Sequence, residues 1–260
     1  MTWPLAKKEL GQHFLVDKNI RGVIGRLAEL ERDDVVLEVG PGLGILTIYL
    51  AEHVKLVHAI ELDRELEVEL RAVSDVAGNV ELVFGDALQL DLGALAPPPT
   101  KLVANLPYNI ATPLVVESFD RAPTLALWCV MVQREVADRF FAAPSSKAYG
   151  AVSVLVQLRA ERTGFHPVSR TVFRPRPNVD SALVAFRRRE EVLPDAERVK
   201  RVVTAAFAHR RKRLANSLEL AGLASREDAA RALEAIGRDP VARAEALAPP
   251  EFVALSDALP

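Results

Sequence analysis

The residues with the most specific chemistry form the tetrapeptide Asn105-Leu106-Pro107-Tyr108, which closes an apolar, strand-like run. The side-chain oxygen of Asn105 and the backbone carbonyl of Leu106 are acceptors that can hold the two hydrogens of an aromatic amine. Such an amine is a poor nucleophile because its lone pair is delocalised, and acceptors on both hydrogens favour the pyramidal nitrogen that attacks an electrophile. Pro107 would stiffen the turn, and Tyr108 would stack on the ring. We therefore predict a catalytic site for an aromatic amine; the alternative is a plain strand-ending turn.

A second aromatic residue, Phe173, begins the run 173–181, in which prolines alternate with arginines. The tetrapeptide 105–108 resembles the (Asn/Asp/Ser)-Pro-Pro-(Tyr/Phe) motif of amino-methyltransferases that act on nucleobases, which implies a base as the target. Prolines hold the run 173–181 extended, so we expect Phe173 to form the other wall of the base pocket. Arg174 and Arg176 are expected to contact RNA phosphates. The alternative for Phe173 is a ring that fills the core beside a rigid loop.

A glycine cluster at positions 40, 42 and 44 follows Glu38 at the end of another apolar run. Gly40 and Gly42 would let a ligand approach the backbone closely, in a turn that needs conformations glycine adopts at low cost. A dinucleotide enzyme would prefer the spacing GxGxxG. The alternating spacing here resembles the S-adenosylmethionine site of Rossmann-like methyltransferases, and that cofactor has no pyrophosphate to cradle. A plain turn between strand and helix is the alternative.

Two acidic residues support a cofactor site. Glu61 ends the next strand-like run, where a carboxylate accepts hydrogen bonds from both hydroxyls of a ribose. Asp86 follows the third run, where an acid can accept from an adenine amine. Leu62 and Ala87, which come directly after these acids, are expected to line the same cofactor site. The alternative for both acids is a strand-end cap or solvated charge.

The formal net charge of -2 does not itself suggest a nucleic-acid partner, but the cations are unevenly distributed. Residues 199–213 contain six cations and no acid, and residues 159–189 contain eight arginines and two acids. Such clusters can neutralise phosphates and make binding salt-dependent. Solvated helix faces balanced by nearby acids are the alternative. The strongest candidates for RNA contact outside the active site are four consecutive cations, Arg210, Arg211, Lys212 and Arg213.

The elements that must position these residues alternate along the chain. Strand-like runs lie at 35–39, 56–61, 80–84, 101–105 and 125–131, and helical patterns lie at 45–51, 64–73 and 133–141. Strands that alternate with helices predict βαβ units and an α/β, Rossmann-like fold with a mostly parallel sheet flanked by helices. The pattern at 149–158 fits either a helix or a buried strand. Two further strand-like runs, 163–168 and 179–186, predict a hairpin at one sheet edge.

The pattern changes after Arg189, where apolar residues recur at helical spacing with no strand-like run. This predicts two domains: residues 1–189 would carry the cofactor and base sites, and residues 190–260 would form a small all-helical domain that contacts RNA.

Other functions are disfavoured by what the sequence contains. One cysteine, Cys129, lies in an apolar run and is expected to be a buried core thiol. This cysteine and five scattered histidines give no metal-ligand spacing, so we expect no metal. No run approaches the roughly 20 apolar residues of a membrane span, and no apolar signal core is seen. We expect a cytoplasmic protein.

Together these motifs resemble the ribosomal RNA adenine dimethyltransferase family, in particular its bacterial small-subunit enzymes, nearly from end to end. The matching stretches are 10–15, 38–44, 61–63, 85–87, 105–114, 146–150, 173–181 and 206–218. The resemblance implies transfer of two methyl groups from S-adenosyl-L-methionine to each of two adjacent adenosines in the 3′-terminal hairpin of 16S rRNA. It also implies that the substrate is a 30S subunit late in assembly, which connects the reaction to ribosome biogenesis. Nothing in the sequence suggests an obligate dimer, so a monomer is expected.

The resemblance also implies which residues bind the cofactor. The family's cofactor residues correspond to six positions of this chain: His13, Leu15, Gly40, Glu61, Asp86 and Asn105. His13 is a departure, because many relatives carry Asn there, although His can still donate or accept a hydrogen bond. A surface-loop role is the alternative for His13.

Three other functions are less consistent with the sequence. Related enzymes dimethylate an adenine of 23S rRNA, but residues 105–114 and the arginine-rich C-terminal stretch look more like the 16S group. A non-catalytic assembly factor would not need the intact Glu61, Asp86, Asn105 and Tyr108. A DNA adenine methyltransferase lacks support because no sequence-reading domain is evident.

Overall fold

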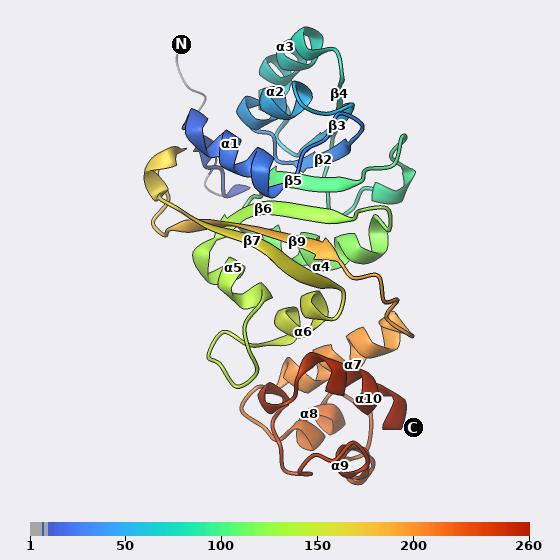
Figure 1. Ribbon diagram of the computed structural model, residues 1–260. Helices are drawn as coiled ribbons and strands as arrows, with labels where there is room; N and C mark the ends of the chain where they lie inside the picture. Colours follow the sequence, from blue (N-terminus) through green and yellow to red (C-terminus); the bar gives the residue numbers. More distant parts are fainter. Residues whose placement is uncertain (1–6, 8–9) are drawn as a thin grey trace. The chain divides into compact units, whose positions relative to one another are not determined.

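The computed structural model describes Lys7 and residues 10–260. The chain divides into two compact units, which are considered separately. The first unit contains Met1–Ala137 and Glu161–Arg188, and the second contains Asp138–Ala160 and Arg189–Pro260. Figure 1 shows the mixed sheet of the first unit and the helices that follow it along the chain.

A seven-stranded sheet forms the frame of the first unit, in the order β4-β3-β2-β5-β6-β9-β7. Strands β4, β3, β2, β5 and β6 run parallel to one another, and β9 is antiparallel to β6. The predicted α/β fold and the first four predicted strands are confirmed, and β9 next to an edge strand β7 agrees with the predicted hairpin. The strands are β2 (Val35–Val39), β3 (Leu56–Glu61), β4 (Val80–Phe84), β5 (Lys101–Asn105), β6 (Leu127–Gln133), β7 (Ala160–Val168) and β9 (Ser181–Arg188).

The helices of the first unit follow the strands, as the alternating pattern predicts. The segment 64–73, predicted as one helix, begins as a 3₁₀ turn over Arg64–Leu66 and continues as an α-helix to Ala77. The helices are α1 (Lys18–Leu27), α2 (Ile45–Ala51), α3 (Glu67–Ala77), α4 (Ala111–Arg121) and α5 (Arg134–Phe140), the last of which runs into the second unit.

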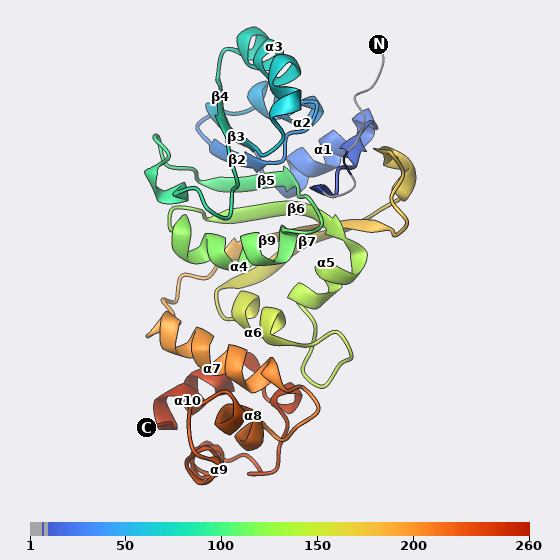
Figure 2. The same cartoon turned by 180° about the vertical axis from the view of Figure 1, so that it is seen from behind.

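Helices cover both faces of this sheet, which explains why its central strands are continuously apolar. Buried residues of α1 and α2 pack on one face in a cluster that includes the buried thiol of Cys129. The preceding side chain on β6, Trp128, points to the opposite face, where its indole donates to the Ser118 hydroxyl of α4 at 2.8 Å. The centroids of the Trp128 and Phe119 rings are 4.5 Å apart. Accordingly, α1 lies in front of the sheet in Figure 1 and α4 lies in front in Figure 2.

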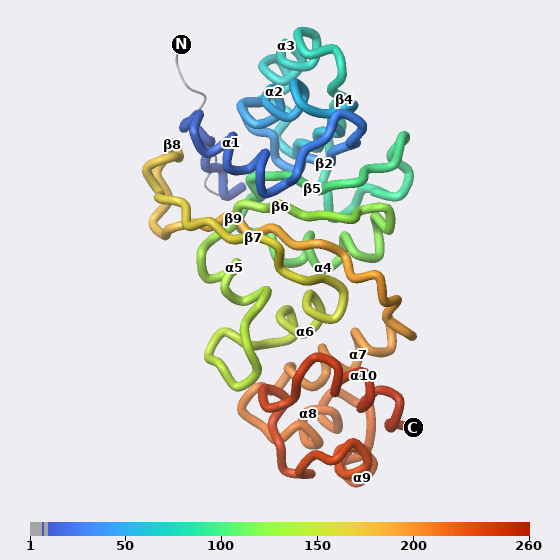
Figure 3. The backbone as a smooth tube through the Cα atoms, in the orientation of Figure 1, coloured from blue at the N-terminus to red at the C-terminus, as the bar shows by residue number. Residues whose placement is uncertain are grey.

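A separate two-stranded sheet joins the N-terminal segment to the proline-rich run. It pairs β1 (Phe14–Leu15) with β8 (Phe173–Arg174) in antiparallel register. The Val16 amide extends the ladder by donating to the Val172 carbonyl at 2.8 Å. Figure 3 shows this approach of chain segments that are about 160 positions apart in sequence. This small sheet fixes the edge of the functional site.

The second unit is helical, as predicted after Arg189. The ambiguous pattern at 149–158 forms the helix α6, and residues 138–160 belong to this unit, which differs from the predicted division at 189. The reason is packing: α6 contacts α7 and α10, and the Tyr149 hydroxyl donates to the Leu247 carbonyl at 2.8 Å. The helices are α6 (Ala151–Gln157), α7 (Ala196–Ala208), α8 (Leu214–Leu220), α9 (Arg226–Ala235) and α10 (Pro249–Ala258). Within the part of the chain that the structure describes, no helix has the length and apolar character to cross a membrane.

Candidate active site

A pocket lies at the carboxyl ends of β2, β3, β4 and β5, where ligands bind in open α/β sheets. Residues 10–15 of the N-terminal segment close one side of it. The structure thus brings together residues that the sequence placed in separate motifs. Those that line the pocket are His13, Leu15, Gly40, Gly42, Glu61, Leu62, Asp86, Ala87, Asn105, Leu106, Pro107 and Tyr108.

The glycine turn after β2 is what allows the two predicted motifs to meet. Gly40 has a φ of 74°, and a Cβ there would lie 3.0 Å from the ring of Pro107. Gly42 has a φ of 59°, and a Cβ there would lie 3.0 Å from the ring of Phe14. Side chains would be strained at both positions and would push away the walls of the pocket. Glycine is therefore required here by both conformation and space.

Glu61 is held rigidly at the end of β3. One carboxylate oxygen accepts from the Asp63 amide at 2.9 Å, and the other accepts from the Gly42 amide at 3.1 Å. Burial raises the pKa of Glu61, although these backbone donors oppose the rise. A carboxylate offers about four lone-pair positions, so both oxygens can accept further hydrogen bonds from a ligand.

The N-terminal segment is tied to the same strand end through Asp63, a residue of the matching stretch 61–63 to which the sequence alone assigned no role. Its carboxylate accepts from the Lys7 ammonium and from the Gln12 amide, each at 2.8 Å. Burial alone would raise the pKa of Asp63, but the hydrogen bonds from Lys7 and Gln12 bring it below its ordinary value. Asp63, whose amide also orients Glu61, therefore links the N-terminal wall of the pocket to the end of β3.

Glu38 is a pocket residue that sequence reasoning did not assign, although it stands directly before the glycine cluster. Its side chain is 1% exposed, and its Oε2 has no hydrogen-bond partner among the described residues. Burial raises the pKa of Glu38 to about 8, with a smaller contribution from the Glu61 carboxylate, and the Thr47 hydroxyl opposes the rise. Glu38 is therefore a buried carboxyl beside the pocket whose neutral form is favoured in the ligand-free protein.

Replacing Glu38 with Gln is expected to make the ligand-free protein more stable relative to the wild type at high pH than at low pH. The pKa of Glu38 is raised from 4.5 to about 8, so its favourable contribution is complete below pH 4.5 and is lost as the pH rises through 8. Gln stays neutral throughout. As the pH rises from 5 to 8.5, the free energy of unfolding of Glu38→Gln minus that of the wild type should therefore increase by roughly 1–3 kcal/mol.

Urea unfolding at both pH values measures this difference. Glu69→Gln, a substitution at an exposed residue of α3, is the matched control and should show little such gain. A Glu38→Gln difference that does not vary with pH would contradict the raised pKa.

Asp86 and Leu62 occupy the rest of the predicted cofactor side. Asp86 Oδ1 accepts from the Leu88 amide at 2.9 Å, which fixes the carboxylate after β4. Leu62 is 52% exposed although it is a large apolar residue, and it borders the pocket. An apolar side chain at a pocket edge suits one face of a flat ring.

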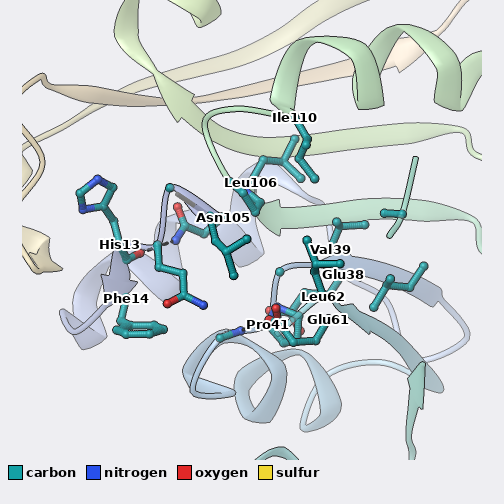
Figure 4. Close-up of a pocket in the computed structure, with 18 of the residues that line it drawn as sticks. His13, Phe14, Glu38, Val39, Pro41, Glu61, Leu62, Asn105, Leu106 and Ile110 are labelled. Atoms are coloured by element: carbon teal, nitrogen blue, oxygen red, sulfur yellow. Dashed lines mark hydrogen bonds between the residues drawn. The ribbon is translucent and has the colours of Figure 1, made fainter. Parts of the chain in front are cut away.

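Asn105 ends β5 at the centre of the pocket (Figure 4). Its side-chain amide donates to the His13 carbonyl at 3.0 Å, which directs the nitrogen toward the N-terminal segment and leaves the amide oxygen as an acceptor. The Leu106 amide donates to the Met131 carbonyl at 3.1 Å, which anchors the turn to the end of β6. The turn that carries the predicted amine acceptors is thus fixed on both sides.

Tyr108 follows at the same edge of the pocket. Its hydroxyl forms a 2.6 Å hydrogen bond with the hydroxyl of Ser181, the first residue of β9. The rings of Tyr108 and His13 have centroids 5.3 Å apart and planes inclined by 38°. Burial raises the pKa of Tyr108, and the hydrogen bond with Ser181 opposes the rise. Ser181 is a second residue that the sequence motif contained but that received no role.

Phe173 does not line the pocket, and its predicted place as the second wall of the base site is wrong in this structure. It is 4% exposed and belongs to the apolar cluster under α1 and α2. The cause is the pairing of β8 with β1, which sets Phe173 opposite Leu15, another member of that cluster. The ring next to Tyr108 comes instead from His13.

The predicted RNA-binding cations differ in their surroundings. Arg174 and Arg176 are exposed in the run 173–181 of the first unit. In the second unit, Arg210 donates to the carbonyls of Lys147 and Tyr149 at 2.9 and 2.6 Å, so it holds a loop of its own unit. The three cations after it are exposed: Arg211, Lys212 and Arg213. Among the described residues no group of three or more His, Cys, Asp or Glu side chains is arranged to hold a metal ion.

Comparison with known proteins agrees with this geometry. A family model described as ribosomal RNA adenine dimethylase matches residues 4–249. The protein named ribosomal RNA small subunit methyltransferase A of Rubrobacter xylanophilus is 50% identical over 252 residues, which cover 97% of this chain and 94% of that protein. A protein of the same name from Phenylobacterium zucineum is 44% identical over 257 residues, covering 97% and 88% of the two chains.

Solved structures show the same fold. A dimethyladenosine transferase from Plasmodium falciparum superposes with a TM-score of 0.78 at 24% identity, covering 94% of this chain and 96% of that one. The 23S rRNA methyltransferase ErmE superposes with a TM-score of 0.70 at 29% identity, covering 95% and 99%. With a family model that matches almost the whole chain and relatives at 44–50% identity, this chain belongs to the ribosomal RNA adenine dimethylase family.

Proposed function

We propose that this protein uses S-adenosyl-L-methionine to convert two adjacent adenosines of the 3′-terminal hairpin of 16S rRNA to N6,N6-dimethyladenosine. The observation that carries the chemistry is one pocket in which a glycine turn and two strand-end acids meet the Asn105–Tyr108 turn. The substrate would be the 30S subunit during its assembly. We further propose that the protein acts as a monomer in the cytoplasm.

The residues of the pocket fit this methyl donor. Glu61 offers two fixed carboxylate oxygens to the ribose hydroxyls, and Asp86, beside the apolar Leu62, suits the adenine ring. Glu38 Oε2 is buried without a partner among the described residues, and the donor's ammonium group would favour the ionised form of this carboxyl and pair with it. Gly40 and Gly42 line the pocket without side chains, and this donor has no phosphate that would need a cradle. When bound, the donor supplies an electrophilic methyl group on a sulfonium.

Residues of the Asn105–Tyr108 turn would hold the adenine that accepts the methyl group. Asn105 Oδ1 and the Leu106 carbonyl would accept the two hydrogens of the adenine amine and hold the nitrogen lone pair toward the methyl group. No strong general base is needed, because the amine proton becomes acidic only as the new N–C bond forms. Tyr108 would stack on the base, which must leave its own stack to enter the pocket.

The choice of the small subunit is supported by the relatives. Proteins named ribosomal RNA small subunit methyltransferase A reach 50% identity to this chain, whereas the 23S rRNA methyltransferase ErmE reaches 29%. Transfer of tritiated methyl from the donor to unmethylated 30S subunits, 50S subunits and naked DNA in parallel tests this proposal. We expect label on 30S subunits alone. Label on 50S subunits would contradict the proposed target, and a protein that binds 30S subunits without labelling them would contradict the proposed reaction.

The exposed cations of the second unit should contribute to RNA binding through phosphates. The triple variant Arg211→Ala/Lys212→Ala/Arg213→Ala is expected to weaken 30S binding, because each lost phosphate contact removes about 0.7–0.9 from the slope of log K against log salt. For three lost contacts, the slope of log K against log salt should become about two units less steep.

Filter binding to 30S subunits from 50 to 200 mM salt measures this slope. The paired control is Arg226→Ala/Arg231→Ala, which removes exposed cations of α9 that face acids of their own helix. Equal slopes for the triple variant and the wild type would remove the 211–213 cluster from the RNA surface.

A further inference from the structure

The aromatic rings at the base end of the pocket form a pair. In Figure 4 His13 lies at the opposite end of the labelled side chains from Glu61 and Leu62, with Asn105 between them. The Tyr108 and His13 rings have centroids 5.3 Å apart, which is the separation of rings in direct contact. A base therefore has no place between the two rings and must stack on the pair.

Each ring is held by a polar contact from the same segment, residues 173–181. The Ser181 hydroxyl meets the Tyr108 hydroxyl at 2.6 Å, and the Pro175 carbonyl lies 2.8 Å from His13 Nδ1. Ser181 is 1% exposed and Tyr108 is half-buried, so this contact is partly screened from water. A hydrogen bond to a buried partner fixes the position of the Tyr hydroxyl oxygen and, with it, the direction in which the ring points from the backbone.

The segment that supplies these contacts is itself anchored at both ends. Its start pairs with β1, next to His13, through the Leu15–Phe173 register. Its end joins the main sheet, where the Arg134 amide donates to the Asp180 carbonyl at 2.9 Å and Ser181 faces Gln133. In between, the Arg170 guanidinium reaches the Asn178 carbonyl at 3.2 Å. A segment fixed in this way can hold two rings in a preset arrangement.

We propose that Ser181 is a positioning residue for the target base: with the Pro175 carbonyl it holds Tyr108 and His13 as a preset aromatic platform. The proposal rests on the proposed function, because it takes the ligand of the platform to be an adenine taken out of an RNA stack. It gives the proline-rich run a role different from the one expected of Phe173. The run shapes the base site through polar contacts behind the rings, and Phe173 anchors the run in the core.

The test uses the full-length protein and a short single-stranded RNA that carries 2-aminopurine, a fluorescent adenine analogue that is quenched on stacking. The wild type should quench the probe. Ser181→Ala and Tyr108→Phe each remove one end of the same hydrogen bond and should each weaken probe binding about fivefold, the size expected for one hydrogen bond. The double variant should be no weaker than either single variant, because the bond can be lost only once.

A matched control separates positioning from stability. Ser118 is also a buried serine of the first unit, and it accepts from Trp128 at the opposite face of the sheet. Ser118→Ala should lower the unfolding temperature and leave probe binding by the folded protein unchanged. The rate at which Ser181→Ala methylates 30S subunits should fall about fivefold, while its Kd for the methyl donor should not change.

The outcomes are distinct. Multiplied losses in the double variant, unchanged probe binding in Ser181→Ala, or no quenching by the wild type would each overturn the platform. Coupled losses in probe binding by a protein that methylates no RNA would refute the proposed function and support the platform.

Discussion

Asn105→Ala is expected to lower turnover about a hundredfold or more and to change the affinity for the methyl donor much less. The variant removes one of the two acceptors proposed for the adenine amine, and loss of one oriented polar group at a reacting centre costs on that scale. It also removes the hydrogen bond that Asn105 donates to the His13 carbonyl. Single-turnover methyl transfer to 30S subunits measures the rate, and calorimetry with the donor measures affinity.

Two further variants separate the roles of the Asn105 side chain. Asn105→Asp keeps an oxygen acceptor and loses the donor to His13, so its rate should lie between those of Asn105→Ala and the wild type. Asn19→Ala, at an exposed position of α1, should behave as the wild type. Turnover of Asn105→Ala within a fewfold of the wild-type value would remove Asn105 from the mechanism.

Phe173→Ala is expected to lower the free energy of unfolding by about 3–5 kcal/mol, the usual cost of truncating a buried Phe. The ring is 4% exposed in the cluster that joins α1 and α2 to the sheet, so its loss leaves a cavity beside Leu15. Urea unfolding followed by circular dichroism measures the loss. Phe173→Leu, which keeps most of the apolar volume, should cost less than about 1.5 kcal/mol.

The same variants decide between the two roles considered for Phe173. A base-stacking ring would give a stable Phe173→Ala protein whose turnover is reduced by lost stacking, an effect of about 1–3 kcal/mol. The structure predicts the reverse, a destabilised protein whose loss of unfolding free energy is larger than any loss of activity in its folded fraction. An unchanged unfolding midpoint with slow turnover would return Phe173 to the base pocket.

The sequence predicted the cofactor side of the site because its residues lie at strand ends. In a parallel sheet the carboxyl ends meet at one edge, so Gly40, Glu61, Asp86 and Asn105 had to come together once the four strands were recognised. The strand bounds themselves were accessible because continuous apolar runs ended at glycine or at polar residues. Local pattern and topology therefore sufficed for this half of the pocket.

The sequence could not decide the contacts that depend on pairing between distant segments. Phe173 was compatible with either a pocket wall or the core, and the β1–β8 register decides for the core. Arg210 looked like its cationic neighbours, yet it holds the carbonyls of Lys147 and Tyr149. Residues 138–160 carried no sign that α6 would pack with α7 and α10. Each outcome depends on tertiary contacts that composition and periodicity do not encode.

The most direct test of the central claim is nucleoside mass spectrometry of 16S rRNA after reaction of unmethylated 30S subunits with the protein and S-adenosyl-L-methionine. We predict two N6,N6-dimethyladenosines per 16S rRNA, both within the 3′-terminal fragment, and almost none with Asn105→Ala in the same time. Methylation of another base or at another position of adenine, or dimethyladenosine formed at the wild-type rate by Asn105→Ala, would contradict the proposed site.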